Sequence, residues 1–229
     1  LLYDAFRQMP KLMIHSLPSL TFAVLATFQF SYQFNHFMGK EIFHGDNSDQ
    51  SKPDLVKKYN DGVSWSMFCG AARCGAQFIY GFVCTKISEK IGFKWTSVIG
   101  YSLMTIGLFL FFFVDNQYVY LFIVSLIGIG FGTYMSIPFG ISSISTTINK
   151  LDFGVFHGIL IVFDVIGEYI GNFGVGMGLG QIWPDNPRML IGISSVFGVI
   201  TVISSFWIIE PVIESKVNNM DSFVSLNEN

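Results

Sequence analysis

The chain has 229 residues and a formal net charge of −3, and only 13% of its residues are charged. Soluble globular domains carry about 25% charged residues, so the composition argues against a water-soluble fold. The small net charge gives no indication of a nucleic-acid partner.

Six stretches of the sequence are long, apolar and almost free of charge, with at most two charged residues in each. About 20 helical residues cross the hydrocarbon core of a bilayer, and a helix satisfies its own backbone polar groups there. The sequence therefore predicts an all-α integral membrane fold with six transmembrane helices. Their expected positions are about 14–37, 62–85, 95–114, 118–141, 153–176 and 189–209.

The segments around these helices are polar. We expect one six-helix transmembrane domain over residues 13–212. Residues 1–12 are predicted to be a cytoplasmic lead-in, residues 39–61 an extracellular loop, and residues 213–229 a disordered cytoplasmic tail.

The orientation follows from the distribution of lysine and arginine. A short loop between the second and third predicted helices carries Lys86, Lys90 and Lys94, and short basic loops lie in the cytoplasm. Both ends of this segment are therefore predicted to be cytoplasmic. We expect the plasma membrane rather than an internal membrane.

Three charges fall inside predicted helices: Arg73 in the second, and Asp164 and Glu168 in the fifth. A charge at mid-membrane costs about 2.5–3.5 kcal/mol, and the two acids share one helix side because they are four residues apart. They could pair with Arg73 as a staple between helices, or they could line a water-filled path. We favour the path, with one acid exchanging a proton, because one arginine cannot neutralise two acids.

Further polar side chains extend these faces. The candidates for hydrogen bonding to a hydroxylated solute are Gln29, Gln33, His36, Gln77 and His157. The glutamines could equally be ordinary hydrogen-bonding groups between helices. His157 lies near the inner end of its helix, where a histidine can extend toward the interface.

Glycine spacing predicts close helix packing. Pairs three residues apart, such as Gly128 and Gly132 or Gly167 and Gly171, allow helices to approach closely. Residues 171–180 contain so many glycines that a bent or loosened helix is expected there.

Several short motifs resemble those of one transporter family. They are Met38-Gly39-Lys40-Glu41 with Gly45-Asp46 after it, Gly62-Val63, Ile137-Pro138-Phe139, and Gly154-x3-Gly158-x-Leu160. In these motifs the chain resembles the C-terminal half of a major facilitator. The closest resemblance is to the sucrose/proton symporters and animal proton-associated sugar transporters within the glycoside–pentoside–hexuronide:cation symporter family.

This resemblance implies sugar:proton symport by alternating access, with sugar, proton and lipid bilayer as partners. It also implies a missing N-terminal six-helix half, which agrees with a chain that begins with Leu1 and is expected to be a fragment. The chain departs from the family pattern at Ser64, where an arginine is usual, and at Gly167-Glu168, where Pro-Gln is usual.

A second reading is a non-transporting six-helix membrane protein that acts as an assembly or regulatory partner. An enzyme is not expected, because the spans contain no nucleophilic triad and no metal-ligand spacing. Neither a cofactor nor a metal is predicted.

Overall fold

The computed structural model describes residues 6–48, 50–149, 151–182 and 186–210, and all regular structure within these ranges is helical. In chain order the elements are α2 (Lys11–Phe37), η1 (Met38–Ile42), α3 (Pro53–Leu110), α4 (Val119–Asn149), α5 (Phe153–Tyr169), η2 (Ile170–Met177), α6 (Gly178–Ile182) and α7 (Pro187–Ser205), where η marks a π-helix. Within the described ranges, five helical segments are long and apolar enough to cross a membrane. The predicted tail at 213–229 lies outside the described residues.

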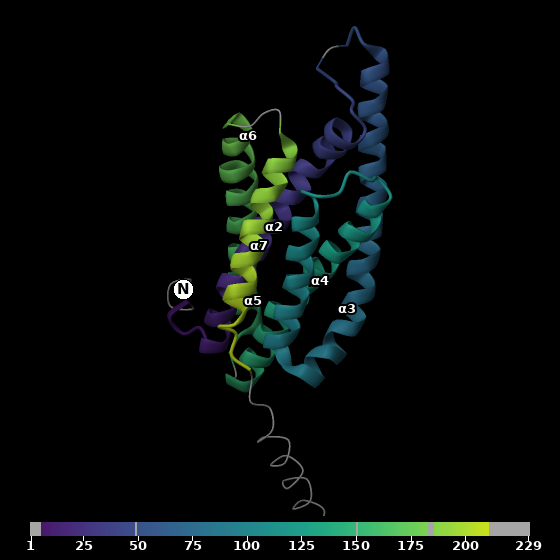
Figure 1. Ribbon diagram of the computed structural model, residues 1–229. Coiled ribbons are helices and arrows are strands. Elements are labelled where there is room, and N and C mark those ends of the chain that lie inside the picture. Colours follow the sequence, from purple (N-terminus) through teal and green to yellow (C-terminus); the bar gives the residue numbers. More distant parts are fainter. Residues whose placement is uncertain (1–5, 49, 150, 183–185, 211–229) are drawn as a thin grey trace, which may run out of the picture.

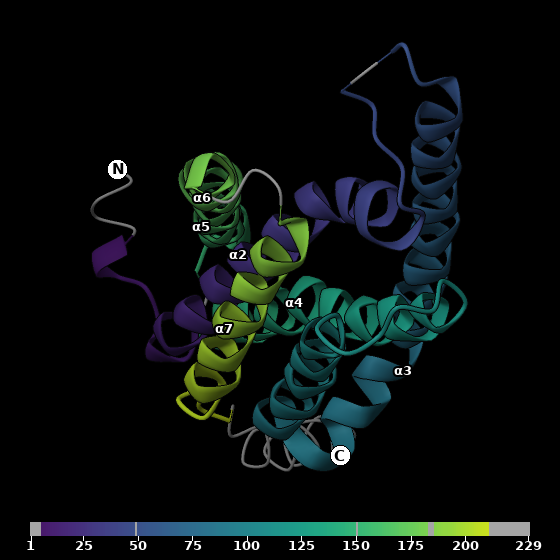
Figure 2. The ribbon, with the colours of Figure 1, turned by 45° about the horizontal axis from the view of Figure 1, so that its top comes forward.

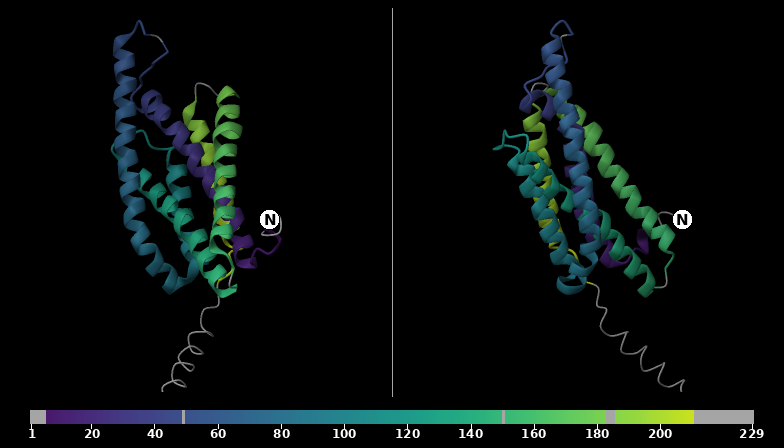
Figure 3. Two further views of the ribbon diagram at one scale, coloured as in Figure 1. Left: turned by 180° about the vertical axis from the view of Figure 1, so that it is seen from behind. Right: turned by 90° about the vertical axis from the view of Figure 1, so that its right-hand side faces the viewer.

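The longest helix, α3, folds back on itself at Gly92. The backbone of Gly92 has φ 86° and ψ 162°, a conformation that glycine adopts without steric cost. Residues 53–91 form the first arm and residues 93–110 the second arm, and the chain reverses its direction between the two (Figure 1 and Figure 3). The prediction of a basic loop between these segments is wrong, because the first arm stays helical up to the turn.

A carboxylate that follows α7, far away in the sequence, closes this turn. Glu210 accepts hydrogen bonds from the backbone N–H groups of Phe93 (2.9 Å) and Lys94 (2.7 Å). These donors are at the start of the second arm, where the first turn of a helix has no intrahelical acceptors. A Cβ atom on Gly92 would collide with the Glu210 carboxylate, so a glycine is needed both for the backbone angle and for the approach of Glu210.

The predicted loop at 39–61 is much shorter in the structure. The π-helix η1 continues α2 to Ile42, and α3 begins at Pro53, which occupies the first turn of the helix, a position that proline favours. The sequence argument failed here because charged residues show exposure to water but do not exclude a helix. The first arm of α3 therefore begins before its apolar part. In Figure 3 this end of the arm extends past the other helices.

The helices form one bundle in which α2 contacts α3, α4, α5 and α7. Figure 2 shows the first arm of α3 on one side of the bundle and α5 on the other, with α2, α4 and α7 between them. Helix α4 approaches the first arm of α3 closely at Gly128 and Gly132. A Cβ on Gly128 would lie 2.5 Å from the carbonyl oxygen of Arg73, and one on Gly132 would lie 2.7 Å from the Tyr80 ring. The predicted close packing at this glycine pair is confirmed.

The glycine-rich end of the fifth predicted helix stays helical but changes type. The chain passes from α5 into the π-helix η2 and then into α6. Glycine weakens an α-helix by about 1 kcal/mol per residue, and π-helical turns are a common way for a weakened helix to widen without ending. The segment is therefore loosened without being broken, and Gly171 at its start packs against Leu25 of α2.

Candidate functional site

The first arm of α3 places Arg73 against α2 and α4. The Arg73 Nη1 donates a hydrogen bond to Ser31 Oγ on α2 (2.9 Å), and the guanidinium carbon lies 4.4 Å from the centre of the Phe131 ring on α4. A guanidinium over an aromatic face is stabilised by the ring's negative potential. Arg73 is thus held in a partly buried position by two neutral groups.

The two acids predicted beside Arg73 lie on α5, one turn apart. Both Asp164 and Glu168 are partly buried, and Asp164 Oδ1 is a buried atom with no hydrogen-bond partner among the described residues. Within the described residues, neither acid forms an ion pair with Arg73. The staple between helices requires such a pair, so the geometry offers no support for that role.

A buried tyrosine on α4 that the sequence did not single out is near these charges. Tyr134 on α4 is 1% exposed, and it is within electrostatic range of Asp164, Glu168 and Arg73. Its ring also contacts Phe131, the ring beneath Arg73, at a centroid distance of 5.5 Å. No signal in the sequence distinguishes Tyr134 from the other eight tyrosines, because its importance comes from the rotation of α4.

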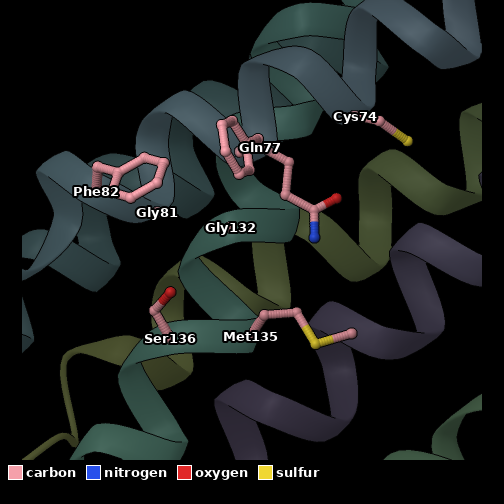
Figure 4. A pocket seen from close by; sticks show the side chains of 8 residues that line it. Cys74, Gln77, Gly81, Phe82, Gly132, Met135 and Ser136 are labelled. Carbon is pink, nitrogen blue, oxygen red and sulfur yellow. The ribbon is translucent and has the colours of Figure 1, made fainter.

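Gln77, one turn along α3 from Arg73, lines an open cavity of about 570 Å³ between the first arm of α3 and α4. Figure 4 shows the Gln77 amide beside the segment of α4 that carries Gly132, Met135 and Ser136. The rest of the lining is mainly apolar and includes Phe78 and Phe82. The cavity thus offers a few polar groups on an apolar wall, the usual composition of a small-molecule site.

The other predicted solute ligands do not line this cavity. Gln29 is fully buried in the bundle, and both polar atoms of its amide lack a partner among the described residues. Gln33 is 6% exposed, and His36 Nδ1 lies 3.2 Å from the hydroxyl of Tyr59. Their roles in solute binding stay predictions.

His157 lies between two aromatic rings near the start of α5. Its ring centre is 4.6 Å from that of Phe139 and 4.9 Å from that of Phe153. Its Nδ1 is buried with no partner in the described part of the chain. The predicted solute contact of His157 stays a prediction.

The Met38-Gly39-Lys40-Glu41 motif lies at the end of the bundle opposite the Gly92 turn. Met38 is fully buried, and a Cβ on Gly39 would lie 2.7 Å from the Tyr59 ring, so the motif packs η1 tightly against α3. Glu41 Oε2 lies 3.9 Å from Arg188 Nε at the start of α7.

Arg188 contacts three residues at this end of the bundle, and the sequence argument did not identify it as a site residue. In addition to Glu41, it hydrogen-bonds Asp115 Oδ1 through Nη2 (2.5 Å) and lies 5.6 Å from the Phe37 ring centre. We call Glu41, Asp115 and Arg188 the outer latch, because they join η1, the α3–α4 connection and α7.

The Gly154-x3-Gly158 motif on α5 is packed less tightly than the Met38-Gly39-Lys40-Glu41 motif. A Cβ on Gly158 would meet no atom within 4 Å.

Comparison with known families agrees with the architecture. Residues 51–225 match the family model of the Major Facilitator Superfamily. No curated protein matches the chain.

Proposed function

The chain belongs to the Major Facilitator Superfamily, and from that premise we propose that it forms the C-terminal six-helix half of a sugar:proton symporter that works by alternating access. Members of this family are transporters rather than enzymes, and the apolar helices make the chain a multi-pass integral membrane protein. The sugar, the coupling to protons, the missing N-terminal half and the plasma membrane are parts of the proposal.

The six crossings are supported by the turn at Gly92. The first arm of α3 contains the predicted apolar segment 62–85, the second arm contains most of the segment 95–114, and a reversal at Gly92 returns the chain across the same membrane. Together with α2, α4, α5 and α7, the two arms make six crossings. Facilitators bind their solute near mid-membrane between two such halves, and the cavity lined by Gln77 is open rather than enclosed.

The observation that carries the proposal is the state of Asp164. Its buried Oδ1 has no partner among the described residues, and Arg73 is bound to Ser31 and Phe131 instead of to either acid. An unpaired carboxylate within a membrane is stable only beside water or with a bound proton. Asp164 is therefore suited to bind and release a proton.

Gln77 would bind the sugar directly, because it combines a donor and an acceptor on one side chain and already lines the open cavity. The other predicted ligands would contact the sugar only if the helices rearrange during transport; they are Gln29, Gln33, His36 and His157. Gln29 and Gln33 are buried in this conformation. Alternating access supplies such a rearrangement, because one bundle moves against the other around the site.

The test uses the full-length protein in sealed vesicles that contain a pH-sensitive dye. Addition of sucrose to the wild type should drive proton uptake. Asp164→Asn should abolish proton uptake but retain the exchange of labelled for unlabelled sucrose, a reaction that needs no net proton movement. Asp54→Asn, at an exposed site in the first turn of α3, is the matched control and should behave as wild type. Unchanged proton uptake in Asp164→Asn combined with Glu168→Gln would refute the coupling role.

A further inference from the structure

A set of polar side chains crosses the interior of the bundle next to Tyr134. Tyr80 on the first arm of α3 lies 3.4 Å from Thr133 Oγ1 on α4. On the second arm, a Cβ on Gly100 would collide with the same Thr133 Oγ1, so both arms of α3 meet α4 at this level. The next residue along the second arm is Tyr101, which is fully buried.

The Tyr101 hydroxyl is the least explained group in this region. It has no hydrogen-bond partner among the described residues, although leaving a buried hydroxyl unsatisfied costs about 1–3 kcal/mol. Its electrostatic neighbours are Tyr80, Tyr134 and Cys84. A phenylalanine would fill the same space without that cost, and the chain uses phenylalanine at 25 positions.

The polar groups continue from Tyr80 to the end of the bundle where α3 turns. Cys84 is buried and lies one helical turn beyond Tyr80 on the first arm of α3. Cys84 and Ser136 both line a cavity of about 480 Å³, with Ser88 and Glu89 further along α3. We call this the inner cavity, since the predicted orientation places it on the cytoplasmic side.

We propose that Tyr134, Tyr101, Tyr80, Cys84 and Ser136, which we call the polar track, carry protons between Asp164 and the inner cavity, with water bridging the Tyr101 hydroxyl. This inference rests on the proposed proton coupling and adds its exit path. Ordered water commonly satisfies buried polar groups that lack a protein partner, and such a water would connect Tyr101 to Tyr134 on one side and to Tyr80 on the other.

Each step on the polar track is a simple proton transfer. Asp164 gives up its proton, and every hop breaks one O–H or S–H bond and forms another on the next oxygen or sulfur. Each group is neutral again once the next proton has arrived, so one proton leaves at the inner cavity and no electron is transferred.

The connection through Tyr101 depends on the bridging water, because its hydroxyl has no protein partner among the described residues. A permanently connected track would let protons cross without sugar, so a symporter needs a way to interrupt it. Tyr101 lies on the second arm of α3, and Tyr134 and Thr133 lie on α4. A small shift between these helices would therefore make or break the connection.

The experiment compares Tyr101→Phe and Tyr80→Phe in the full-length protein in the same dye-loaded vesicles. Both variants should lose sucrose-driven proton uptake while retaining the exchange of labelled for unlabelled sucrose, because exchange does not require proton release. Cys84→Ala should behave in the same way, and Cys84→Ser, which restores a group able to donate and accept, should recover proton uptake. Tyr118→Phe, at a tyrosine 64% exposed at the opposite end of the bundle, is the control and should match wild type.

Several outcomes would overturn the polar track. Normal proton uptake in both tyrosine variants would show that protons leave by another route. Loss of sucrose exchange together with proton uptake would assign the tyrosines to solute binding or folding instead. If Asp164→Asn itself retains proton uptake, the coupling proposal fails. If Asp164→Asn loses proton uptake while Tyr101→Phe takes up protons as the wild type does, only the polar track is refuted.

Discussion

Replacement of Gly92 by alanine should destabilise the bundle by opening the contact between Glu210 and the second arm of α3. An L-residue held at a positive φ with an extended ψ, a region that is essentially restricted to glycine, costs about 1–3 kcal/mol. The new Cβ would also displace the Glu210 carboxylate from the N–H groups of Phe93 and Lys94, and loss of a helix N-cap of this kind costs about 1 kcal/mol. We therefore expect Gly92→Ala to lower the free energy of unfolding by about 2–4 kcal/mol.

The assay is denaturant titration of the full-length protein in mixed micelles, with Glu210→Ala and the double variant measured in parallel. Glu210→Ala alone should cost about 1 kcal/mol. The double variant should cost less than the sum of the two, because both changes remove one interaction. Gly70→Ala, at a helical glycine where a Cβ would meet no atom within 4 Å, is the control and should show no loss. Equal stabilities of Gly92→Ala and Gly70→Ala would refute the role of the turn.

Three further predictions concern single contacts. Ser31→Ala should lower the free energy of unfolding by about 1 kcal/mol, because Arg73 loses its hydrogen bond, and Ser31→Thr should retain it; equal melting temperatures of Ser31→Ala and the wild type would contradict the contact. Arg188→Gln should open the outer latch. A water-soluble maleimide should then label a cysteine introduced in place of Asn116 faster than it does when Arg188 is present. An unchanged labelling rate would show that the latch does not hold this end closed. Gly132→Leu should destabilise the protein by about 1–3 kcal/mol through overpacking against Tyr80, and denaturant titration that shows no loss would mean that α4 can move away from α3.

Much of the fold could be predicted from the spacing of charges alone. A stretch without charges long enough to cross a bilayer has few alternatives to a helix, which is why each of the six apolar segments is mostly helical. The turn at Gly92 and the early start of α3 at Pro53 could not be predicted in the same way. Both depend on local backbone geometry and on a partner, Glu210, more than 100 residues away in the sequence.

The candidate site was only partly predictable. Arg73, Asp164 and Glu168 could be identified because a charge at mid-membrane is costly and needs a reason. Tyr134 and Tyr101 could not, because a tyrosine in an apolar helix is common and its role depends on what it faces. The sequence also grouped Gln29 with Gln77, whereas the structure buries the first and exposes the second to a cavity, since the rotation of α2 is set by its packing against four other helices.

The central claim is that Asp164 exchanges a proton when the solute binds, and it can be tested without a membrane. A pH indicator would record the protons bound or released when sucrose is added to the full-length protein in detergent at low buffer strength. We predict a proton change of similar size in the wild type and in Glu168→Gln, and none in Asp164→Asn. A proton change in Asp164→Asn equal to that of the wild type would contradict the account.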